Sequence, residues 1–418
     1  MHSARAEHSK KIAIKSAKAL VPGYGTSGIP FGRLVPSSDI VSGIRPRRAA
    51  RGGRGDPHHA KPAEDLPGSW LKTLLGFESI ATTHATQSAA EEAIASGFEW
   101  SRASAELRKP PANDDLEKMT TQVIDSALGE YENQRNRSRS RARSILGHIH
   151  LASTASVRTP YALLESRRAA GCDKAGLPIM SLLSGCSGLL FALQQARFLL
   201  QDEQGATDED AFVLISCSND LLPFAHTRGR SPAGHSEDID AWLFQAIFGE
   251  GAGAIVVGRA HPGGGDWVIE DMGRETVADD WRVTMVSEEG APSMVIRARE
   301  VGMTFRTHVP RAAKRGLDAL GMGAFGGLHR LCVHESNPNL VAHVASTLGA
   351  SNVVHSISAE VGTLAAVSVF SLLEEALRSH GSHGEGDGGA RDAIVCALIG
   401  ETGNSVVAGH VALRFARA

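Results

Sequence analysis

The sequence contains few aromatic residues and little excess charge. Aromatic residues make up 5% of the 418 residues, and only 3 of them are tyrosines, which is too few for an aromatic-rich binding face. The 43 basic and 46 acidic residues give a formal charge of -3, so the chain as a whole is not a polyanion binder. No apolar run approaches the roughly 18 residues of a membrane helix. The charged first residues also lack the apolar core of a secretory signal.

Cysteine is also scarce, and the spacing of the cysteines excludes two classes of site. There are 5 cysteines in the chain: Cys172, Cys186, Cys217, Cys332 and Cys396. They form no CxxC pair and no metal-ligand pattern, so we expect neither a zinc site nor a disulfide framework. We expect no metal and no cofactor, and a reducing cytoplasm as the compartment.

The bulk composition is that of an ordinary globular protein. Apolar residues make up 42% and charged residues 21%, and the length suits two domains or one large layered domain. Strand-like and helix-like segments alternate, which indicates an α/β architecture with covered sheets. Glycine-started apolar helices, from Gly185 and Gly362, occur once in each half. We therefore expect two similar halves, 1–230 and 231–418.

Two arginine-rich segments stand apart from this pattern. The stretch 22–67 is rich in glycine and proline and contains a basic run at 45–54, and a second run lies at 135–143. We interpret 22–67 as a mobile basic insertion; a partner or phosphate patch is the alternative. A nucleic-acid site is disfavoured because the second run has no interleaved aromatic residues for base stacking.

Hydrophobic periodicity and cap residues predict most of the individual elements. The predicted strands are 12–21, 144–151, 177–184, 211–217, 248–258, 328–333, 393–400 and 405–415. The predicted helices are 114–131, 188–200, 301–320, 337–348 and 362–379.

Cys186 is the strongest candidate for a nucleophile. It lies where a strand is expected to end and a buried helix to begin, between Gly185 and Ser187. The unpaired N–H groups of a helix N-terminus carry partial positive charge, which favours a thiolate. The alternative is a small buried hydrophobic residue, and this is how we interpret Cys217 and Cys396, which lie within apolar strands.

Five segments, in this order, resemble the ketoacyl-ACP synthase III branch of the thiolase-like superfamily. These are 184–196 around Cys186, 248–254 (FGEGAGA), 333–337 (VHESN), 362–368 (GTLAAVS) and the terminal hairpin 399–415. The resemblance covers roughly 69–418, and more weakly 12–21. It implies a thiolase-like five-layered αβαβα fold built from two similar halves.

The resemblance also implies a mechanism. Cys186 would take an acyl group from a thioester on coenzyme A or an acyl carrier protein, as in covalent catalysis. His334 matches the catalytic histidine of the family and would stabilise the enolate of the second substrate. The oxyanion hole would use the N–H of Cys186 and the hairpin residues Gly403 and Asn404, of which Asn404 replaces a family glycine.

Three positions beside these residues bear on the chemistry. Thr363 stands where the family has an asparagine, and its hydroxyl offers a single donor. Losing one oxyanion donor typically costs about 2.7–4 kcal/mol, so efficient decarboxylation is in doubt. Glu335 is either a local base or a surface carboxylate. Asn337 matches the last residue of the family's histidine segment and is expected to support His334.

The donor site also departs from the family. Trp70 matches a tryptophan that stacks on the adenine of coenzyme A, whereas Leu74 stands where the family has the second, arginine half of that clamp. The missing arginine mildly favours a carrier protein over coenzyme A as the carrier of the donor acyl group.

These observations favour one function and leave alternatives open. The favoured function is an acyltransferase that condenses an acyl group on Cys186 with a malonyl- or β-ketoacyl-carrier thioester, in specialised fatty-acid or polyketide-type biosynthesis. The first alternative is acyl transfer to a hydroxyl or amine without decarboxylation. The second is a non-catalytic subunit of a heterodimeric ketosynthase. We expect acyl-CoA or acyl-carrier thioesters as substrates, a homodimer, and neither nucleic acid nor membrane as a partner.

Overall fold

The computed structural model describes most of the predicted core. The described residues are 11–20, 45–46, 98–99, 113–135, 145–152, 168, 176–201, 210–219, 251–261, 265–278, 298–335, 338–356, 363–380, 392–402 and 405–417. The insertion 22–67 lies outside them except for the two-residue strand β2 (Arg45–Pro46), which pairs with β3 (Phe98–Glu99).

A nine-stranded sheet runs through the molecule in the order β5-β4-β6-β7-β1-β8-β11-β10-β9. The strands of its first half are β1 (Ile12–Leu20), β4 (Ile145–Ala152), β5 (Ile179–Leu183), β6 (Phe212–Asn219) and β7 (Gly251–Arg259). Those of its second half are β8 (Trp267–Ala278), β9 (Arg330–Val333), β10 (Ala393–Thr402) and β11 (Ser405–Phe415). The halves join where β1 pairs with β8 over two residues.

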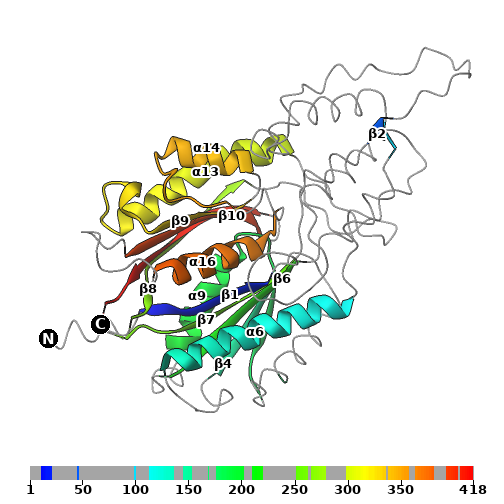
Figure 1. Ribbon diagram of the computed structural model, residues 1–418, viewed down its shortest axis with the longest axis vertical. Coiled ribbons are helices and arrows are strands. Elements are labelled where there is room, and N and C mark those ends of the chain that lie inside the picture. Colours follow the sequence, from blue (N-terminus) through cyan, green and yellow to red (C-terminus); the bar gives the residue numbers. More distant parts are fainter. Residues whose placement is uncertain are drawn as a thin grey trace, which may run out of the picture.

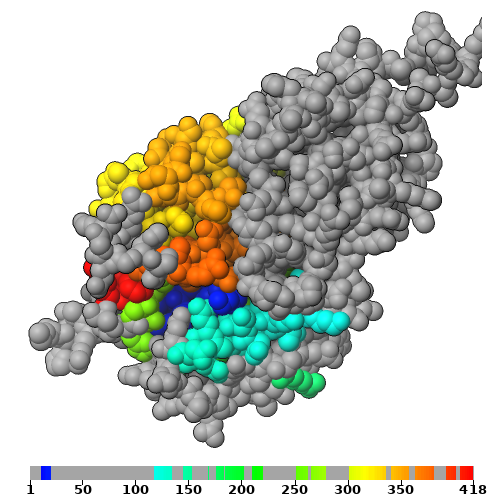
Figure 2. All heavy atoms as spheres, viewed as in Figure 1, coloured from blue at the N-terminus to red at the C-terminus, as the bar shows by residue number. Residues whose placement is uncertain are grey.

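Helices cover both faces of each half and give five layers. The helices are α6 (Asn113–Arg135), α9 (Gly188–Gln201), α13 (Ala298–Ala319), α14 (Pro338–Thr347) and α16 (Ala366–His380). α6 packs on one outer face, and α13 and α14 pack on the other. α9 and α16 lie between the two halves of the sheet, in one continuous apolar cluster (Figure 1). From α14 through α16 and β1 to α6, the layers follow one another across the face in Figure 2. The expected αβαβα fold is therefore confirmed.

The two halves repeat the same order of elements. In the first, β1 is followed by α6, β4, β5, α9, β6 and β7; in the second, β8 is followed by α13, β9, α14, a bridge at Val354, α16, β10 and β11. Only α14 has no counterpart among the described elements of the first half. Lateral strand order is also repeated, because β9-β10-β11-β8 matches β4-β6-β7-β1. The second copy of this repeat begins at β8.

Most predicted elements are present, with ends shifted by a few residues, but the sequence analysis missed β8. Its second half is polar and only partly buried, so it lacks the continuous apolar run by which the other buried strands were found. Gly253 allows α16 to pack closely on β7. A methyl group there would lie 2.7 Å from the Cβ of Phe370 on α16.

A buried ion pair joins the two halves at the junction of the sheet. The Lys15 ammonium on β1 donates to the carboxylate of Asp266, the residue before β8. The Lys15 side chain is 1% exposed and the Asp266 side chain 10%. Removing one partner of a buried pair leaves an uncompensated charge, which typically costs about 3–5 kcal/mol.

We therefore predict that Asp266→Ala lowers the free energy of unfolding by about 3–5 kcal/mol, measured by urea denaturation. The control is Asp318→Ala, because Asp318 pairs with Lys314 on the surface of α13. The Lys314 side chain is 66% exposed and the Asp318 side chain 57%. That change should cost no more than about 0.5 kcal/mol. Equal effects of the two substitutions would contradict the structural role of the buried pair.

Candidate active site

Cys186 occupies a tight turn between β5 and α9. The turn is closed by a hydrogen bond from the Gly188 N–H to the Gly185 carbonyl, 2.9 Å long. Two further bonds fix it to the end of β10: the Gly185 N–H donates to the Glu401 carbonyl (2.9 Å), and the Ser187 hydroxyl donates to the Gly400 carbonyl (3.0 Å). The second half of the molecule therefore holds the Cys186 turn of the first.

Gly400 allows the close approach of β10 to this turn. A methyl group at position 400 would lie 2.7 Å from the backbone nitrogen of Ser187 and 2.8 Å from that of Cys186. Both neighbours are backbone atoms of a fixed turn, so neither can shift cheaply. A side chain at position 400 would therefore push the Cys186 turn away from β10.

The surroundings of Cys186 oppose the thiolate that the start of a helix would favour. Burial raises the pKa of Cys186 to about 12, and the nearby Glu401 carboxylate adds to the increase. A hydrogen bond from the backbone N–H of Cys186 opposes this change in pKa. The start of α9 does supply a favourable donor, but the loss of hydration outweighs it.

His334 follows β9 and is also held by β10, because its N–H donates to the Ala397 carbonyl at 2.9 Å. The side chain is buried, and burial lowers the pKa of His334 to about 3. The imidazole is therefore neutral at physiological pH. Its Nδ1 atom is buried and has no hydrogen-bond partner among the described residues. Its ring lies 6.2 Å from that of Phe305 on α13, centroid to centroid.

Glu335 and Thr363 meet beside His334. Glu335 is fully buried, so the surface-carboxylate interpretation is wrong; its Oε2 accepts a hydrogen bond of 3.1 Å from Ser356. The Thr363 hydroxyl donates to the backbone carbonyl of Glu335. Because a hydroxyl has one proton, the donor of Thr363 is engaged by the chain and is not directed at a substrate.

The segment after Thr363 enters α16 through a strained residue. Ala365 has φ 47°, in the left-handed region that a residue with a Cβ rarely adopts. Its carbonyl accepts a hydrogen bond of 2.7 Å from the Ser368 hydroxyl. The N–H of Val367 donates to the carbonyl of Leu364 at 3.0 Å. Such strain persists only where the surrounding structure fixes it, and it is common at functional sites.

Four predicted site residues lie outside the described part of the chain: Trp70, Asn337, Gly403 and Asn404. Sequence analysis also missed the contributions of Ala397, Gly400 and Glu401. A sequence signal for this contact is present at Gly400, a glycine at the end of an apolar strand. Gly403 and Asn404 remain the predicted oxyanion residues of the hairpin. Cys217 and Cys396 are buried in the core, as expected.

Within the ranges that the structure describes, no three His, Cys, Asp or Glu side chains are grouped as they would be around a metal ion. None of the described helices is long and apolar enough to cross a membrane.

Solved structures with this arrangement are found among condensing enzymes. The 3-oxoacyl-[acyl-carrier-protein] synthase III of Aquifex aeolicus superposes with a TM-score of 0.60 at 17% identity, over 97% of this chain and 100% of that one. Xanthomonas campestris OleA, in a structure with lauric acid and lauroyl-CoA, gives 0.63 at 13% identity, over 97% and 99%. The tetronic acid condensing enzyme AbyA1 gives 0.60 at 16%, over 96% and 99%.

This chain has the thiolase-like fold of ketoacyl-ACP synthase III-like enzymes. The similarity extends over almost the whole length of each protein. At 12–18% identity it establishes the fold and leaves the reaction to be argued from the residues. No family model matches the sequence.

The raised pKa of Cys186 gives a testable pH dependence. Only the thiolate is alkylated, so we predict that the rate of iodoacetamide alkylation at Cys186 rises about tenfold per pH unit from 7 to 10 without a plateau. Glu401→Gln should increase the rate at each pH, because it removes a like charge and lowers the pKa of the thiol.

Alkylation would be followed by peptide mass spectrometry on protein shown to be folded by circular dichroism. The matched control is Glu117→Gln on the outer helix α6, which should leave the rate unchanged. A plateau below pH 8 would show that Cys186 is a thiolate in the resting protein.

Proposed function

We propose that the protein is an acyltransferase that carries an acyl group on Cys186 and transfers it to a carrier-bound thioester by a Claisen-type condensation. The observation that supports this most directly is that the Cys186 turn and His334 are both bound to the same strand. Their attachment points, Gly400 and Ala397, are three residues apart on β10, which is roughly 10 Å for a strand. A nucleophile and a neutral imidazole are thereby positioned from opposite halves of the fold.

The acylation step follows from these two groups. The Cys186 thiol loses its proton to the neutral imidazole of His334, and the thiolate attacks the carbonyl carbon of a donor thioester. The backbone N–H of Cys186, at the start of α9, stabilises the oxyanion, with Gly403 and Asn404 as the proposed second contribution. The carbon–sulfur bond to the donor breaks, and the departing thiolate takes the proton from His334.

The condensation step uses the acyl group on Cys186. A malonyl-carrier thioester loses carbon dioxide, or a β-ketoacyl-carrier thioester loses an α-proton to His334, and either leaves an enolate. The enolate carbon attacks the acyl carbonyl, a carbon–carbon bond forms, and the bond to Cys186 breaks. The Cys186 thiolate then takes up a proton, from solvent in the first case and from His334 in the second. The buried Nδ1 of His334, which has no partner among the described residues, is a polar atom available to substrate. In this scheme Trp70 contacts the donor, Asn337 supports His334, and Glu335 and Thr363 position the His334 turn.

The engaged hydroxyl of Thr363 weighs on the choice of acceptor. Enolate stabilisation falls to His334 without a second side-chain donor from this position, so decarboxylation should be slow. Transfer to a hydroxyl or amine needs a base but no enolate, and it is the second candidate reaction for that reason. Specialised biosynthesis of fatty-acid or polyketide type agrees with both reactions.

The first experiment measures the covalent intermediate. Purified protein incubated with a panel of acyl-CoA and acyl-carrier thioesters should gain the mass of a single acyl group that maps to Cys186. Cys186→Ala should form no adduct, and His334→Ala should form it at least about tenfold more slowly, as expected for loss of a general base.

The second substrate then separates the alternatives. Release of carbon dioxide from a malonyl-carrier thioester would identify decarboxylative condensation. Acyl transfer to a hydroxyl or amine without that release would identify the other reaction. No adduct with any donor, in folded protein, would contradict the proposal and favour the non-catalytic subunit.

We also propose a homodimer formed through β5. β5 is the edge strand of the sheet, and Ile179 on it is 37% exposed. An unpaired strand edge with an exposed apolar residue is a template for a second strand. A second copy that paired along β5 would continue the sheet across the dimer.

The oligomeric state can be measured by light scattering coupled to size exclusion. We expect a dimer for the unchanged protein and a monomer at micromolar concentration for Ile179→Lys. Met303→Lys is the control, because Met303 is 54% exposed on α13, far from β5 in the order of layers. A monomeric parent protein, or a dimer unaffected by Ile179→Lys, would contradict this interface.

A further inference from the structure

Both neighbours of Cys186 in the chain are bound to consecutive carbonyl groups of β10. The Gly185 N–H donates to the carbonyl of Glu401 at 2.9 Å, and the Ser187 hydroxyl donates to that of Gly400 at 3.0 Å. Cys186 is therefore the middle residue of a segment that is held at both ends. Only the bond of Ser187 comes from a side chain, so it is the part of this attachment that depends on the residue type.

The Ser187 hydroxyl bonds to β10 at a place that is closed to water. Ser187 is 0% exposed, and a methyl group at Gly400 would lie 2.7 Å from its backbone nitrogen. The hydroxyl thus holds the turn in the space that the glycine leaves open. Because solvent does not compete for this bond, removal of the hydroxyl costs the Gly400 carbonyl a hydrogen bond without a ready replacement.

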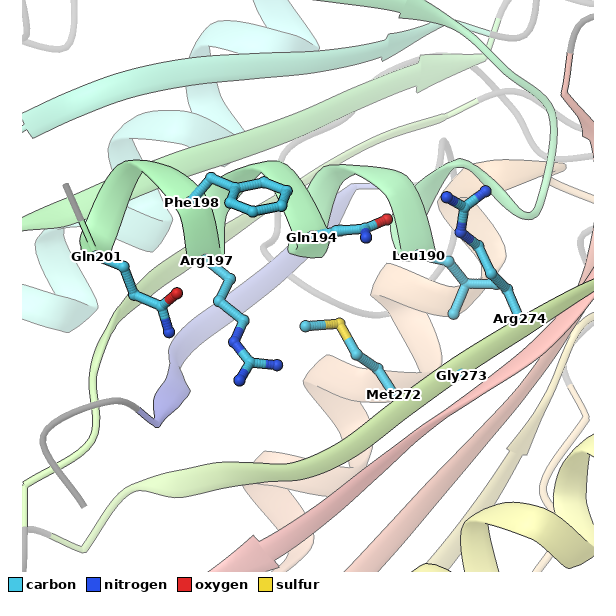
Figure 3. Close-up of a pocket in the computed structure, with 8 residues that line it drawn as sticks. All are labelled: Leu190, Gln194, Arg197, Phe198, Gln201, Met272, Gly273 and Arg274. Carbon is cyan, nitrogen blue, oxygen red and sulfur yellow. The ribbon is translucent and has the colours of Figure 1, made fainter. Parts of the chain in front are cut away.

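The helix that follows Ser187 is held in place by other contacts. Leu190 is 3% exposed and belongs to the apolar cluster between the two halves. The guanidinium carbon of Arg274 on β8 lies 4.1 Å from the centroid of the Phe191 ring. Figure 3 shows Leu190 and Arg274 at the same end of α9. Loss of the Ser187 bond should therefore loosen the Cys186 turn and leave α9 in place.

We infer that Ser187 is a positioning residue for acyl transfer at Cys186. With Gly185 and Ser187 both bound to β10, the backbone of Cys186 keeps one orientation. Its N–H, the proposed oxyanion donor, then keeps a fixed direction. A misplacement of about 1 Å at a reacting centre can cost roughly a hundredfold in rate. The effect on rate rests on the proposed function, whereas the effect on the turn does not.

The test compares Ser187→Ala with a matched control, Ser16→Ala. Ser16 on β1 is 1% exposed, and its hydroxyl donates to the carbonyl of Ala127 on α6 at 2.8 Å. Both substitutions therefore remove a buried hydroxyl that is bonded to a distant backbone carbonyl, but only one of them touches the Cys186 turn. A second variant, Ser187→Cys, fills the same space with a weak donor and should shift each measurement in the same direction as alanine.

The first measurement is amide hydrogen exchange of the full chain, followed by mass spectrometry of a peptide that spans residues 183–191. Ser187→Ala should exchange at least about tenfold faster in this peptide, because the turn has lost one of its two attachments. Ser16→Ala should leave the exchange of this peptide unchanged. This measurement does not require any acyl donor.

The second measurement is the rate of acyl adduct formation at Cys186 over a range of donor concentrations. Ser187→Ala should lower the rate at saturating donor about tenfold and leave the half-saturating concentration within twofold. Loss of a purely structural contact would not confine its effect to the saturating rate. Ser16→Ala should change neither quantity.

Three results would overturn the inference. They are unchanged exchange of the 183–191 peptide in both Ser187 variants, equal effects of Ser16→Ala and Ser187→Ala, and a weaker donor affinity with an unchanged saturating rate. A parent protein that forms no adduct would contradict the acyltransferase proposal, and the exchange measurement would still decide whether Ser187 holds the Cys186 turn.

Discussion

The end of β10 is the physical link between the two halves of the candidate site. Its carbonyl groups accept from the Cys186 turn on one side, through Gly185 and Ser187, and from the backbone of His334 on the other. Backbone hydrogen bonds of this kind fix position without depending on side-chain rotamers. The close packing at Gly400 leaves no space in which the Cys186 turn could move toward β10. The relative placement of Cys186 and His334 is therefore a property of the sheet.

That placement has an electrostatic consequence. Burial raises the pKa of the Cys186 thiol and lowers that of the His334 imidazole, so both groups are neutral at rest. The site stores no thiolate–imidazolium pair, and charge separation must accompany substrate binding. A neutral resting thiol is poorly reactive toward adventitious electrophiles.

Much of the fold was predictable because buried strands and helices leave strong patterns. The continuous apolar runs at 212–217 and 251–257 and the apolar helix after Cys186 were readable without tertiary information. β8 was not predictable in this way, because its second half is polar and only partly buried. The ion pair of Lys15 with Asp266 joins residues 251 positions apart, and no local pattern indicates such a pair.

The sequence by itself determined the residue types at the site and their order along the chain, from Cys186 to His334 and Thr363. It also determined the alternation of elements that gives five layers, since period and apolar content are local properties. Only the tertiary structure decided the protonation of Cys186, the burial of Glu335 and the engagement of the Thr363 hydroxyl. These depend on desolvation and on partners supplied by distant segments, because the pKa of a group reflects its surroundings in space and not its neighbours in the chain.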